Sequence, residues 1–511
     1  MKMLLQYLLL QTLVIYCCTG EVPSNTEVVS REISTDATYK IIVSLTSSLN
    51  TTDVRFLSIA TDNDRMATKW KSTPKFKNLA SALSPCDFRL GGTSADMLTF
   101  SPSRRTRRQQ GHASKLDPLS RIIMKGKQWD ILTDFIKSVG WDLMFDLNIF
   151  FWRSDGLWDS TNAELLLNHS SARGIRIPYF ELGNEPNAYL GKFRFRIDPQ
   201  TLAKDFQILK TLISKYPLYA SSKLYGPDVT NVEIRADARA YYRQFVTAIP
   251  EGVIDEFSLH HYYLNGRKAK AQDFLNVAVL DSLKYVLDIA LQTSLASPHP
   301  LRTRLTETSS CYGGGAPGLS DRYIAGFLWL DKLGLSAQYG ITRVFRQSII
   351  GASYALITPQ NDPTPDYYLS VIFKRLVEGP VFNVSLDVSN QNLRVYAHCA
   401  RRDTYSPGAL VIYYLNLANA KAVLSVDQFK DASLHLFLLT PGDKEGLTSK
   451  FVKLNGKTLL MNGPTLPPMP PKPHKGKVTV EAQSFGFIVV PQANVQLCVD
   501  YFTNLNSQKS Q

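Results

Sequence analysis

The chain of 511 residues is basic, with 57 Lys and Arg against 44 Asp and Glu and a formal net charge of +13. This length is too great for one ordinary core, so we expect one large domain and one smaller one, and 44% hydrophobic residues suffice to bury both. A balance this basic favours anionic partners.

The N-terminal residues have the pattern of a secretory signal peptide. Lys2 precedes a Leu-rich stretch from Leu4 to Tyr16, and the small residues near Gly20 suit a signal-peptidase site. We predict a signal peptide over residues 1–20 and a protein that is secreted or directed to the lysosome. An uncleaved anchor would need about 20 apolar residues followed by basic ones, and no later stretch of the sequence is suited to span a bilayer. The secretory route favours sulfated polysaccharide over nucleic acid as the anionic partner.

Six cysteines are present, of which Cys17 and Cys18 leave with the signal peptide. The remaining four permit two disulfides and do not make a disulfide scaffold: Cys86, Cys311, Cys399 and Cys498. Sequons consistent with glycosylation on the secretory route begin at Asn50, Asn168 and Asn383.

Short apolar runs alternate with helix-like segments from about residue 78 to residue 379, the pattern of β/α units around a parallel sheet. Six or seven such units predict a (β/α)8 TIM barrel, which we assign to residues 51–379. The expected strands are Phe88–Leu90, Asp142–Leu147, Tyr179–Leu182, Lys223–Tyr225, Phe257–His260, Leu301–Thr306 and Ile341–Phe345. The expected helices, from apolar residues at i, i+3 and i+4, are Leu202–Ile213, Arg239–Ala248, Ala278–Leu291, Arg322–Leu335 and Tyr367–Val377.

The pattern changes after Gly379 to an alternation with a period of two, which begins at Leu393 and predicts an antiparallel β-sandwich over residues 380–511. The N-terminal segment 21–50 is expected to add a strand to this sandwich, because Val28–Val43 alternates weakly. The other expected elements are strands at Ala409–Leu417, Leu434–Leu439 and Lys477–Val490 and a proline-rich surface loop at Pro464–Pro473.

A basic linker is predicted around residues 101–124. It contains Arg104-Arg105-Thr106-Arg107-Arg108 followed by polar residues, and it has no apolar period. The segment fits a solvated basic loop. It equally fits a processing site for a convertase that recognises R-x-[K/R]-R and cuts after Arg108.

Two carboxylates follow predicted barrel strands, where barrel enzymes place catalytic groups. Glu185 lies in Asn184-Glu185-Pro186, and Glu307 follows Thr306, about three β/α units later. Glycoside hydrolysis needs a carboxylic acid to protonate the leaving oxygen and a carboxylate facing the anomeric carbon, about 5 Å apart in retaining enzymes. The spacing suits such a pair on opposite sides of the barrel mouth. The alternative is that Glu185 caps the following turn and Glu307 pairs with a nearby Arg.

Another strand end between these carboxylates carries His260-His261-Tyr262-Tyr263. Paired histidines suggest a metal site, but neighbouring residues of a strand point to opposite faces, so we expect no metal and no cofactor. A tyrosine hydroxyl here can hold Glu307 ionised and oriented. His260 fits a place beneath the sugar or a place in the core.

Several longer motifs resemble those of glycoside hydrolase family 79, in the clan of Asn-Glu barrels, over nearly the whole mature chain. These motifs are Leu90-Gly91-Gly92-Thr93, Glu181-Leu182-Gly183-Asn184-Glu185-Pro186-Asn187, Lys223-Leu224-Tyr225-Gly226-Pro227-Asp228-Val229, His260-His261-Tyr262-Tyr263-Leu264-Asn265-Gly266-Arg267, Glu307-Thr308-Ser309-Ser310, Tyr312-Gly313-Gly314-Gly315-Ala316-Pro317 and the run from Phe327 to Ala337.

The resemblance implies a retaining endo-β-glucuronidase that hydrolyses glucuronic acid–glucosamine linkages in the heparan sulfate or heparin chains of proteoglycans. It assigns Glu185 as general acid/base and Glu307 as nucleophile, the pair reached from the residues alone. It also implies a disulfide between Cys399 and Cys498. The implied glucuronate-binding residues are Asp62, Thr93, Asn184, Tyr262, Gly313, Gly314 and Tyr354.

The chain departs from the family pattern at the linker, which is much shorter than the excised segment of the family's proenzymes. Two cuts, one cut after Arg108, or an accessible site without any cut all fit this length. Cys86 and Cys311 are unusual for the family, and we expect them at opposite ends of barrel strands and unpaired. Basic positions expected to contact the polymer are Lys125 and Lys127, then Arg235 with Arg239 and Arg243, and Arg267 with Lys268 and Lys270.

Two rival functions remain at the level of sequence. A non-catalytic relative that binds heparan sulfate would share fold and charge, but the presence of Glu185 and Glu307 with Tyr262 argues against it. An exo-acting β-glucuronidase would have a site blocked at one end, which the sequence does not reveal.

Overall fold

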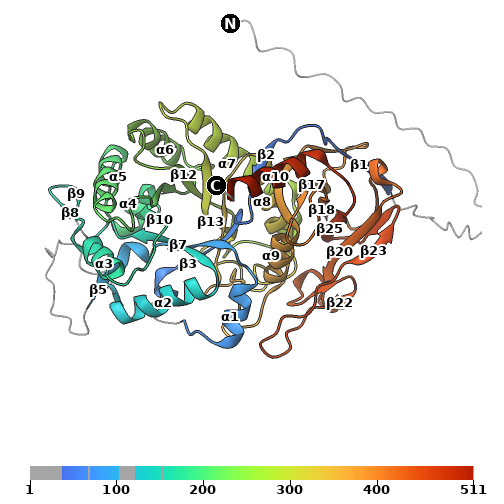
Figure 1. The fold of residues 1–511 in the computed structure, drawn as a ribbon, viewed down its shortest axis with the longest axis horizontal. Coiled ribbons are helices and arrows are strands. Elements are labelled where there is room, and N and C mark those ends of the chain that lie inside the picture. Colours follow the sequence, from blue (N-terminus) through green and yellow to red (C-terminus); the bar gives the residue numbers. More distant parts are fainter. Residues whose placement is uncertain (1–36, 67–69, 103–120, 152, 510–511) are drawn as a thin grey trace, which may run out of the picture. The chain divides into compact units, whose positions relative to one another are not determined.

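The structure, a computed structural model, describes residues 37–66, 70–102, 121–151 and 153–509 (Figure 1). The predicted signal peptide and the predicted processing site at Arg108 lie outside these residues. Among the residues described, no helix is both long and apolar enough to cross a membrane.

Eight parallel strands close into a barrel, in the order β10-β11-β12-β13-β14-β3-β4-β7, which confirms the predicted TIM barrel. The first strand, β3, was not predicted. Its Ser58 and Thr61 break the apolar run, but the hydroxyl of Ser58 is buried and accepts a hydrogen bond from the backbone of Asp87 at 3.0 Å. The barrel strands are β3 (Leu57–Asp62), β4 (Cys86–Gly91), β7 (Trp141–Leu147), β10 (Tyr179–Leu182), β11 (Lys223–Val229), β12 (Glu256–Asn265), β13 (Thr303–Tyr312) and β14 (Val344–Gln347).

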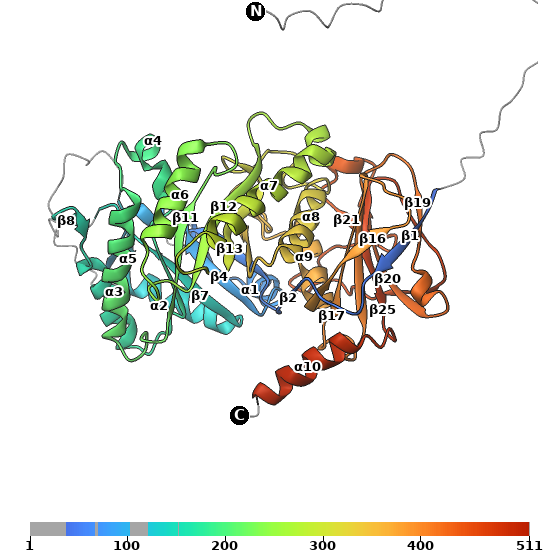
Figure 2. The same cartoon turned by 90° about the horizontal axis from the view of Figure 1, so that it is seen from above.

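Helices surround the barrel (Figures 1 and 2). The five predicted helices are present, although the fourth begins three residues later than expected because the backbone of Tyr323 donates to Ser449 in the sandwich. The helices are α1 (Pro74–Ser81), α2 (Gly126–Ser138), α3 (Thr161–Ser171), α4 (Tyr189–Phe193), α5 (Pro199–Ser214), α6 (Ala236–Ala248), α7 (Val277–Leu295), α8 (Ala325–Gln338), α9 (Pro365–Leu376) and the C-terminal α10 (Gln496–Lys509).

A mainly antiparallel pair of sheets follows the barrel and confirms the predicted sandwich. The larger sheet runs β2-β15-β17-β18-β25-β20-β21-β22, with β23 beside β20, and the smaller runs β16-β1-β19-β24. Their strands are β1 (Ala37–Val43), β2 (Asn50–Thr52), β15 (Val377–Phe382), β16 (Val384–Leu386), β17 (Leu393–Ala400), β18 (Leu410–Asn416), β19 (Ala422–Ser425), β20 (Ser433–Pro441), β21 (Val452–Leu454), β22 (Lys457–Thr458), β23 (Lys472–Lys475), β24 (Val478–Val480) and β25 (Ser484–Val490).

The predicted N-terminal strand is β1, which pairs antiparallel with β16 and parallel with β19. Its alternation places Ile41 and Val43 in the core of the sandwich. The end of the predicted proline-rich loop instead forms β23, which pairs with β20 alone, and an edge position of this kind tolerates Pro473.

Helix α8 joins the barrel to the sandwich. One face of α8 packs closely against the larger sheet of the sandwich. A Cβ atom on Gly326 would lie 2.4 Å from the Phe485 ring, and a Cβ atom on Gly334 would lie 2.5 Å from the Tyr396 ring. Asp331 of the same helix accepts a hydrogen bond from the Tyr396 hydroxyl at 2.6 Å and contacts Arg394. The close approach to Tyr396 accounts for Gly334, the glycine in the motif from Phe327 to Ala337.

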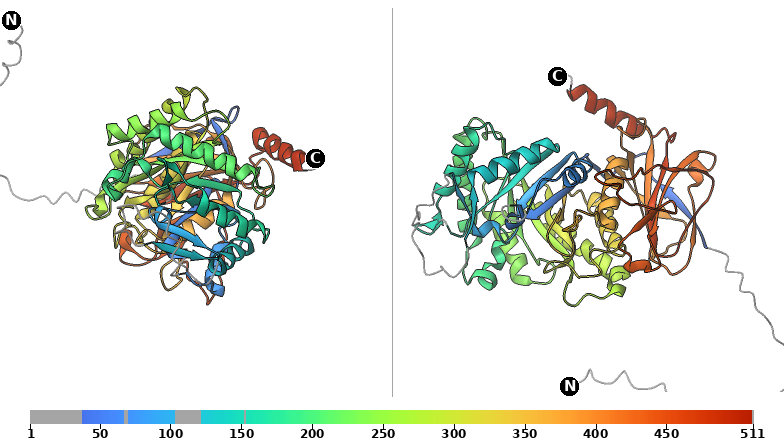
Figure 3. Two further views of the ribbon diagram at one scale, coloured as in Figure 1. Left: turned by 90° about the vertical axis from the view of Figure 1, so that its left-hand side faces the viewer. Right: turned by 90° about the horizontal axis from the view of Figure 1, so that it is seen from below.

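The predicted disulfide between Cys399 and Cys498 is present and ties β17 to α10, with Cα atoms 5.5 Å apart. Helix α10 projects from the sandwich (Figure 3). The Tyr501 hydroxyl donates to the carbonyl of Thr52 in β2 at 3.3 Å. Cys86 and Cys311 are buried and unpaired, as expected.

Two short two-stranded sheets lie outside the barrel and the sandwich. Strands β5 (Leu98–Ser101) and β6 (Ile122–Lys125) flank the basic linker and pair in parallel, and β8 (Arg153–Ser154) pairs with β9 (Leu157–Trp158). Of the three sequon residues, Asn168 and Asn383 are exposed. The side-chain nitrogen of Asn50 instead donates to the Gln338 carbonyl at 2.7 Å, so this nitrogen is not free to carry a glycan.

Candidate active site

A cavity of about 510 Å³ opens at the C-terminal ends of the barrel strands. Residues from the ends of seven barrel strands converge on it, which is the placement expected for a barrel enzyme. The predicted residues that line it are Asp62, Thr93, Glu185, Arg235, His260, Tyr262, Glu307, Gly313, Gly314 and Tyr354. Lining residues that were not predicted include Lys192, Thr230, Asn231, Ile234 and Gln347.

Glu185 follows β10 and begins a short 3-10 helix (Pro186–Ala188), with a backbone φ of 56°. Its side chain does not cap that helix, so the capping alternative is wrong. Instead, Oε1 lies 3.0 Å from Nδ1 of His260, and Oε2 contacts Nζ of Lys192. Burial alone would raise the pKa of Glu185, but Lys192 and His260 outweigh it and hold that pKa well below its usual value.

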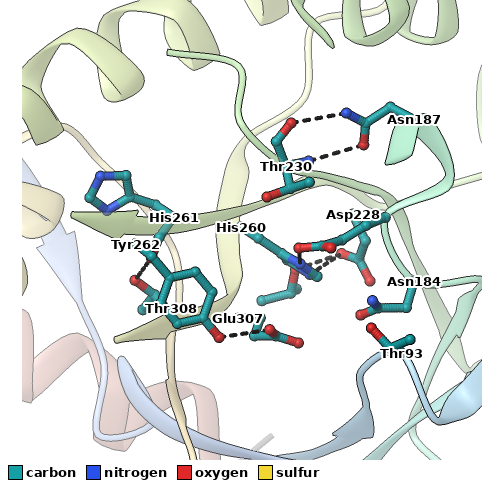
Figure 4. A network of polar contacts seen from close by, with 12 residues as sticks. Thr93, Asn184, Asn187, Asp228, Thr230, His260, His261, Tyr262, Glu307 and Thr308 are labelled. Carbon is teal, nitrogen blue, oxygen red and sulfur yellow. Dashed lines mark hydrogen bonds and ion pairs between the residues drawn. The ribbon is translucent and has the colours of Figure 1, made fainter. Parts of the chain in front are cut away.

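Glu307 lies within β13 with its side chain 11% exposed. Its Oε1 accepts a hydrogen bond from the Tyr262 hydroxyl at 2.7 Å, as predicted (Figure 4). Its Oε2 accepts from Nη1 of Arg89 at 2.9 Å. The alternative interpretation, in which Glu307 pairs with an arginine, is therefore correct about the contact. However, Arg89 lies in the core of the barrel rather than on the surface. Both contacts fix the orientation of the Glu307 carboxyl group.

Arg89 of β4 is the centre of a buried polar network beneath the cavity. Its guanidinium donates to Glu181 at 2.6 Å, to Asp228 at 3.0 Å and to Asn184 at 3.1 Å, besides Glu307. Burial is the largest cause that raises the pKa of Glu181. Sequence reasoning missed Arg89, although a charged residue between Phe88 and Leu90 in a buried strand is a signal of an internal ion pair.

The three groups Glu185, His260 and Glu307 offer ligand atoms that lie within 4.8 Å of one another. A metal is nevertheless a poor fit, because their atoms already contact an ammonium, a guanidinium and a hydroxyl. His261 points away from this cluster and is buried against Tyr263, with ring centroids 4.7 Å apart. The two histidines therefore face opposite sides, as the strand geometry predicted.

Asp62 and Thr93 enter the cavity from the ends of β3 and the β4 loop. Gly92, with a φ of 81°, makes room for Asp62, because a Cβ there would lie 2.1 Å from Oδ1 of Asp62. Burial first, and Glu307 second, raise the pKa of Asp62 to about 7. Asn184 is buried and is not among the residues that line the cavity, and its side-chain oxygen accepts a hydrogen bond from Arg89.

The glycine loop after β13 has positive φ angles of 78°, 91° and 85° at Gly313, Gly314 and Gly315, which favour glycine at each position. A Cβ on Gly313 would meet nothing within 4 Å, so the backbone there is open to a ligand. The carbonyl of Gly314 accepts from the backbone of Ser353 at 2.8 Å. This contact holds Tyr354 in the cavity, its ring 6.2 Å from that of Tyr262.

The predicted basic contacts are only partly brought to the cavity. Arg235 lines its rim but pairs with Asp237 at 3.0 Å. Lys125, Lys127 and Arg267 are exposed and are not among the residues that line the cavity. Their contact with a polymer remains a prediction.

A parallel barrel whose mouth holds two supported carboxylates defines a glycoside hydrolase. Residues 67–334 match the family model described as the N-terminal domain of glycosyl hydrolase family 79. Mouse heparanase is 37% identical over 87% of this chain and 91% of its own length. The chain therefore belongs to glycosyl hydrolase family 79.

Other relatives differ in what their names say of activity. The hyaluronoglucuronidase of Hirudo nipponia is 31% identical over 84% of this chain and 91% of its own length. The human inactive heparanase-2 is 32% identical over 74% of this chain and 66% of its own length. Among solved structures, a rhamnosyl-glucuronidase from Fusarium oxysporum shares the fold with a TM-score of 0.63, at 14% identity over 88% of this chain and 99% of its own.

Proposed function

We propose that this chain is a retaining endo-β-glucuronidase that cleaves heparan sulfate, with Glu185 as general acid/base and Glu307 as nucleophile. The observation that carries the proposal is the approach of carboxylate oxygens of Glu185 and Glu307 to within 4.8 Å. Retaining enzymes hold the two carboxyl groups about 5 Å apart, whereas inverting enzymes need about 6.5 Å or more to admit a water.

In the first step, an oxygen of Glu307 attacks the anomeric carbon of a glucuronic acid. The bond to the glucosamine oxygen breaks, and that oxygen takes the proton of Glu185. Tyr262 and Arg89 keep the attacking carboxylate ionised and oriented. In the second step, Glu185 takes a proton from water while the water oxygen displaces Glu307, so the configuration at the anomeric carbon is retained.

The choice of heparan sulfate rests on the relatives named heparanase and on the net charge of +13. Backbone amides of Gly313 and Gly314 suit the uronate carboxylate, since neither residue has a side chain and nothing lies within 4 Å of the Cβ position of Gly313. Hyaluronan, suggested by the name of the leech relative, is the competing polymer and belongs in the test.

A non-catalytic, polymer-binding protein is the second candidate, because the inactive heparanase-2 is a relative. The contacts of Glu185 with His260 and of Glu307 with Tyr262 favour catalysis over binding alone.

Secretion, processing and glycosylation are proposals that rest on the sequence. They comprise removal of residues 1–20, a cut after Arg108, and glycans at the exposed Asn168 and Asn383. Mass spectrometry of the secreted protein would detect each of them.

The function is tested by the size profile of heparan sulfate after incubation with wild type, Glu185→Gln and Glu307→Gln at about pH 5 and about pH 7. We expect mid-sized fragments from wild type and a loss of at least about 1,000-fold in both variants, since each removes an essential group. A 2-fluoro glucuronide with a good leaving group should add its sugar mass to Glu307, which reports the covalent intermediate.

Glu445→Gln is the matched control, because Glu445 is exposed in the sandwich and outside the site. Intact polymer that the wild-type protein nonetheless retains would favour the binding protein. Monosaccharide release without mid-sized fragments would favour an exo-acting enzyme, and faster cleavage of hyaluronan would change the substrate.

A further inference from the structure

Lys192 forms an ion pair with Glu185, the proposed acid. It lies on α4, seven residues after Glu185, and it lines the cavity with its side chain 28% exposed. Its ammonium contacts Oε2 of Glu185 and donates to the Thr93 hydroxyl at 3.2 Å. Burial would lower the pKa of Lys192, but the contact with Glu185 outweighs it and raises that pKa.

This contact conflicts with the chemistry that Glu185 has to perform. A general acid must carry a proton on an oxygen that faces the leaving group. Here Oε1 faces Nδ1 of His260, and Oε2 contacts the ammonium of Lys192. An ammonium can only donate, so Oε2 cannot carry the proton while Lys192 contacts it, and Oε1 is turned toward a ring instead of a leaving group.

The other charged groups around Glu185 do not remove the conflict. The carboxyl groups of Glu307, Asp62 and Glu233 share its cavity, and Asp228 of β11 lies 3.7 Å from Nε2 of His260. Asp96 also acts on Lys192.

The other cations near the cavity already have partners. The guanidinium of Arg89 is committed to Glu307, Glu181 and Asp228, and that of Arg235, which also lines the cavity, pairs with Asp237. The ammonium of Lys192 is thus the cation that has to leave before Glu185 takes up a proton.

An anion on the substrate can draw the ammonium away. Lysine carries a compact charge on a flexible four-carbon chain, which allows it to change partners. The sugar next to Glu185 is the departing one, which the proposed function identifies as glucosamine. Glucosamine has no carboxylate, so a sulfate is the anionic group that it can offer.

We propose that Lys192 is a positioning residue that keeps Glu185 idle in the free enzyme and releases it when a sulfate of the departing glucosamine binds the ammonium. A proton then replaces the ammonium on Glu185, and the net charge of the site is unchanged. The inference deepens the proposed function and rests on it. It makes sulfation a requirement for the chemical step and not only for binding.

The first test compares two pH profiles of the full-length enzyme on N- and 6-O-sulfated heparosan. The profile of kcat/KM reports the free enzyme, and that of kcat reports the complex. In wild type we expect the basic limb of kcat to lie at least about one pH unit above that of kcat/KM. In Lys192→Gln the basic limb of kcat/KM should move to higher pH and meet that of kcat, because the free acid is released. The inference would be overturned if the basic limbs of kcat and kcat/KM coincide in wild type. It would also be overturned if the basic limb of kcat/KM does not move in Lys192→Gln.

The second test compares kcat on sulfated and unsulfated heparosan. Wild type should prefer the sulfated chain by at least about tenfold in kcat, equivalent to ~1.4 kcal/mol. In Lys192→Gln the ratio should fall toward one, because cleavage of the unsulfated chain gains. Equal kcat values in wild type, or an equal loss on both chains in the variant, would contradict the proposal.

Lys192→Arg keeps the positive charge and should preserve the wild-type ratio of kcat on the sulfated and unsulfated chains. This variant shows whether position 192 tolerates substitution without misfolding. Lys204→Gln, exposed on α5 outside the cavity, removes one positive charge and controls for weaker attraction of the polymer. The inference fails alone if wild type cleaves, Glu185→Gln does not, and Lys192→Gln leaves both readouts unchanged. The proposed function fails with it if wild type cleaves neither chain.

Discussion

At the scale of residues, one guanidinium organises the floor of the site. Arg89 donates to Glu307, Glu181 and Asp228 and lies 3.6 Å from Asp146, so four carboxyl groups share a single buried cation. Burial raises the pKa of Glu181 and of Asp146 nearby, which favours their neutral forms. The charge of Arg89 therefore remains available to Glu307, the carboxylate that has to stay ionised.

Asp62 should make stability depend on pH near neutrality. Its pKa is raised from 3.8 to about 7 in the fold, so its contribution to stability is complete below about pH 4 and is lost as the pH rises through about 7. Asp62→Asn is neutral at every pH. It should therefore gain stability relative to wild type between about pH 4 and about pH 7, by up to ~1.4 kcal/mol per pH unit.

Urea unfolding at three pH values measures this difference. Other titrating groups are the same in both proteins and cancel, and the exposed Asp431→Asn is the matched control. A difference that does not change with pH would show that Asp62 is ionised throughout this range.

The residues predicted for the site were those that follow strands or belong to family motifs. Glu185, Glu307 and Tyr262 fall into this group, and the structure brings them to one cavity. Arg89 and Lys192 were missed for different reasons. Arg89 acts from the middle of a strand, and Lys192 reaches Glu185 from a separate short helix, so neither role is visible in local spacing.

At the scale of elements, apolar periodicity located α5 to α9 but not α1 to α4 or α10. In α3 the buried positions include Asn162 and Ser170, whose hydrogen bonds go to Phe100 and Trp129. Polar residues that are satisfied by distant partners break the sequence pattern without breaking the helix. Strand β3 escaped prediction for the same reason.

The disulfide is the element-scale feature with the largest expected effect on stability. Cys399 and Cys498 are 99 residues apart, and closing such a loop is worth about 4 to 5 kcal/mol in the chain-entropy model. The double variant Cys399→Ser, Cys498→Ser should lose about this much free energy of unfolding in urea. Reducing the wild type should give the same loss, and an unchanged stability would show that α10 and β17 hold together without the bond.

At the scale of the whole molecule, the N-terminal part of the chain belongs to both domains. Strand β1 lies in the sandwich, β2 pairs with β15, and β3 and β4 close the barrel between β14 and β7. The basic linker follows these strands directly after β5. A cut after Arg108 would therefore divide the polypeptide into two chains without removing any of these strand pairings.

Limited proteolysis at the linker tests this arrangement. We expect two fragments on a denaturing gel but a single species of unchanged size on gel filtration, with β3 and β4 retained in the barrel. Dissociation of the fragments without denaturant would contradict it. The uncut protein, carried through the same steps without protease, is the control.

The shared strands turn a cut molecule into an obligate two-chain assembly. Once the linker is severed, unfolding releases two separate molecules, so the melting temperature should rise with protein concentration, whereas that of the uncut chain should not. Refolding would then be a bimolecular encounter, in which a barrel lacking β3 and β4 exposes the open edges of β7 and β14 until the other fragment arrives. The uncut chain folds as one molecule before the cut. After the cut, unfolding would be irreversible in practice at low concentration, since the two diluted fragments have little chance of meeting again.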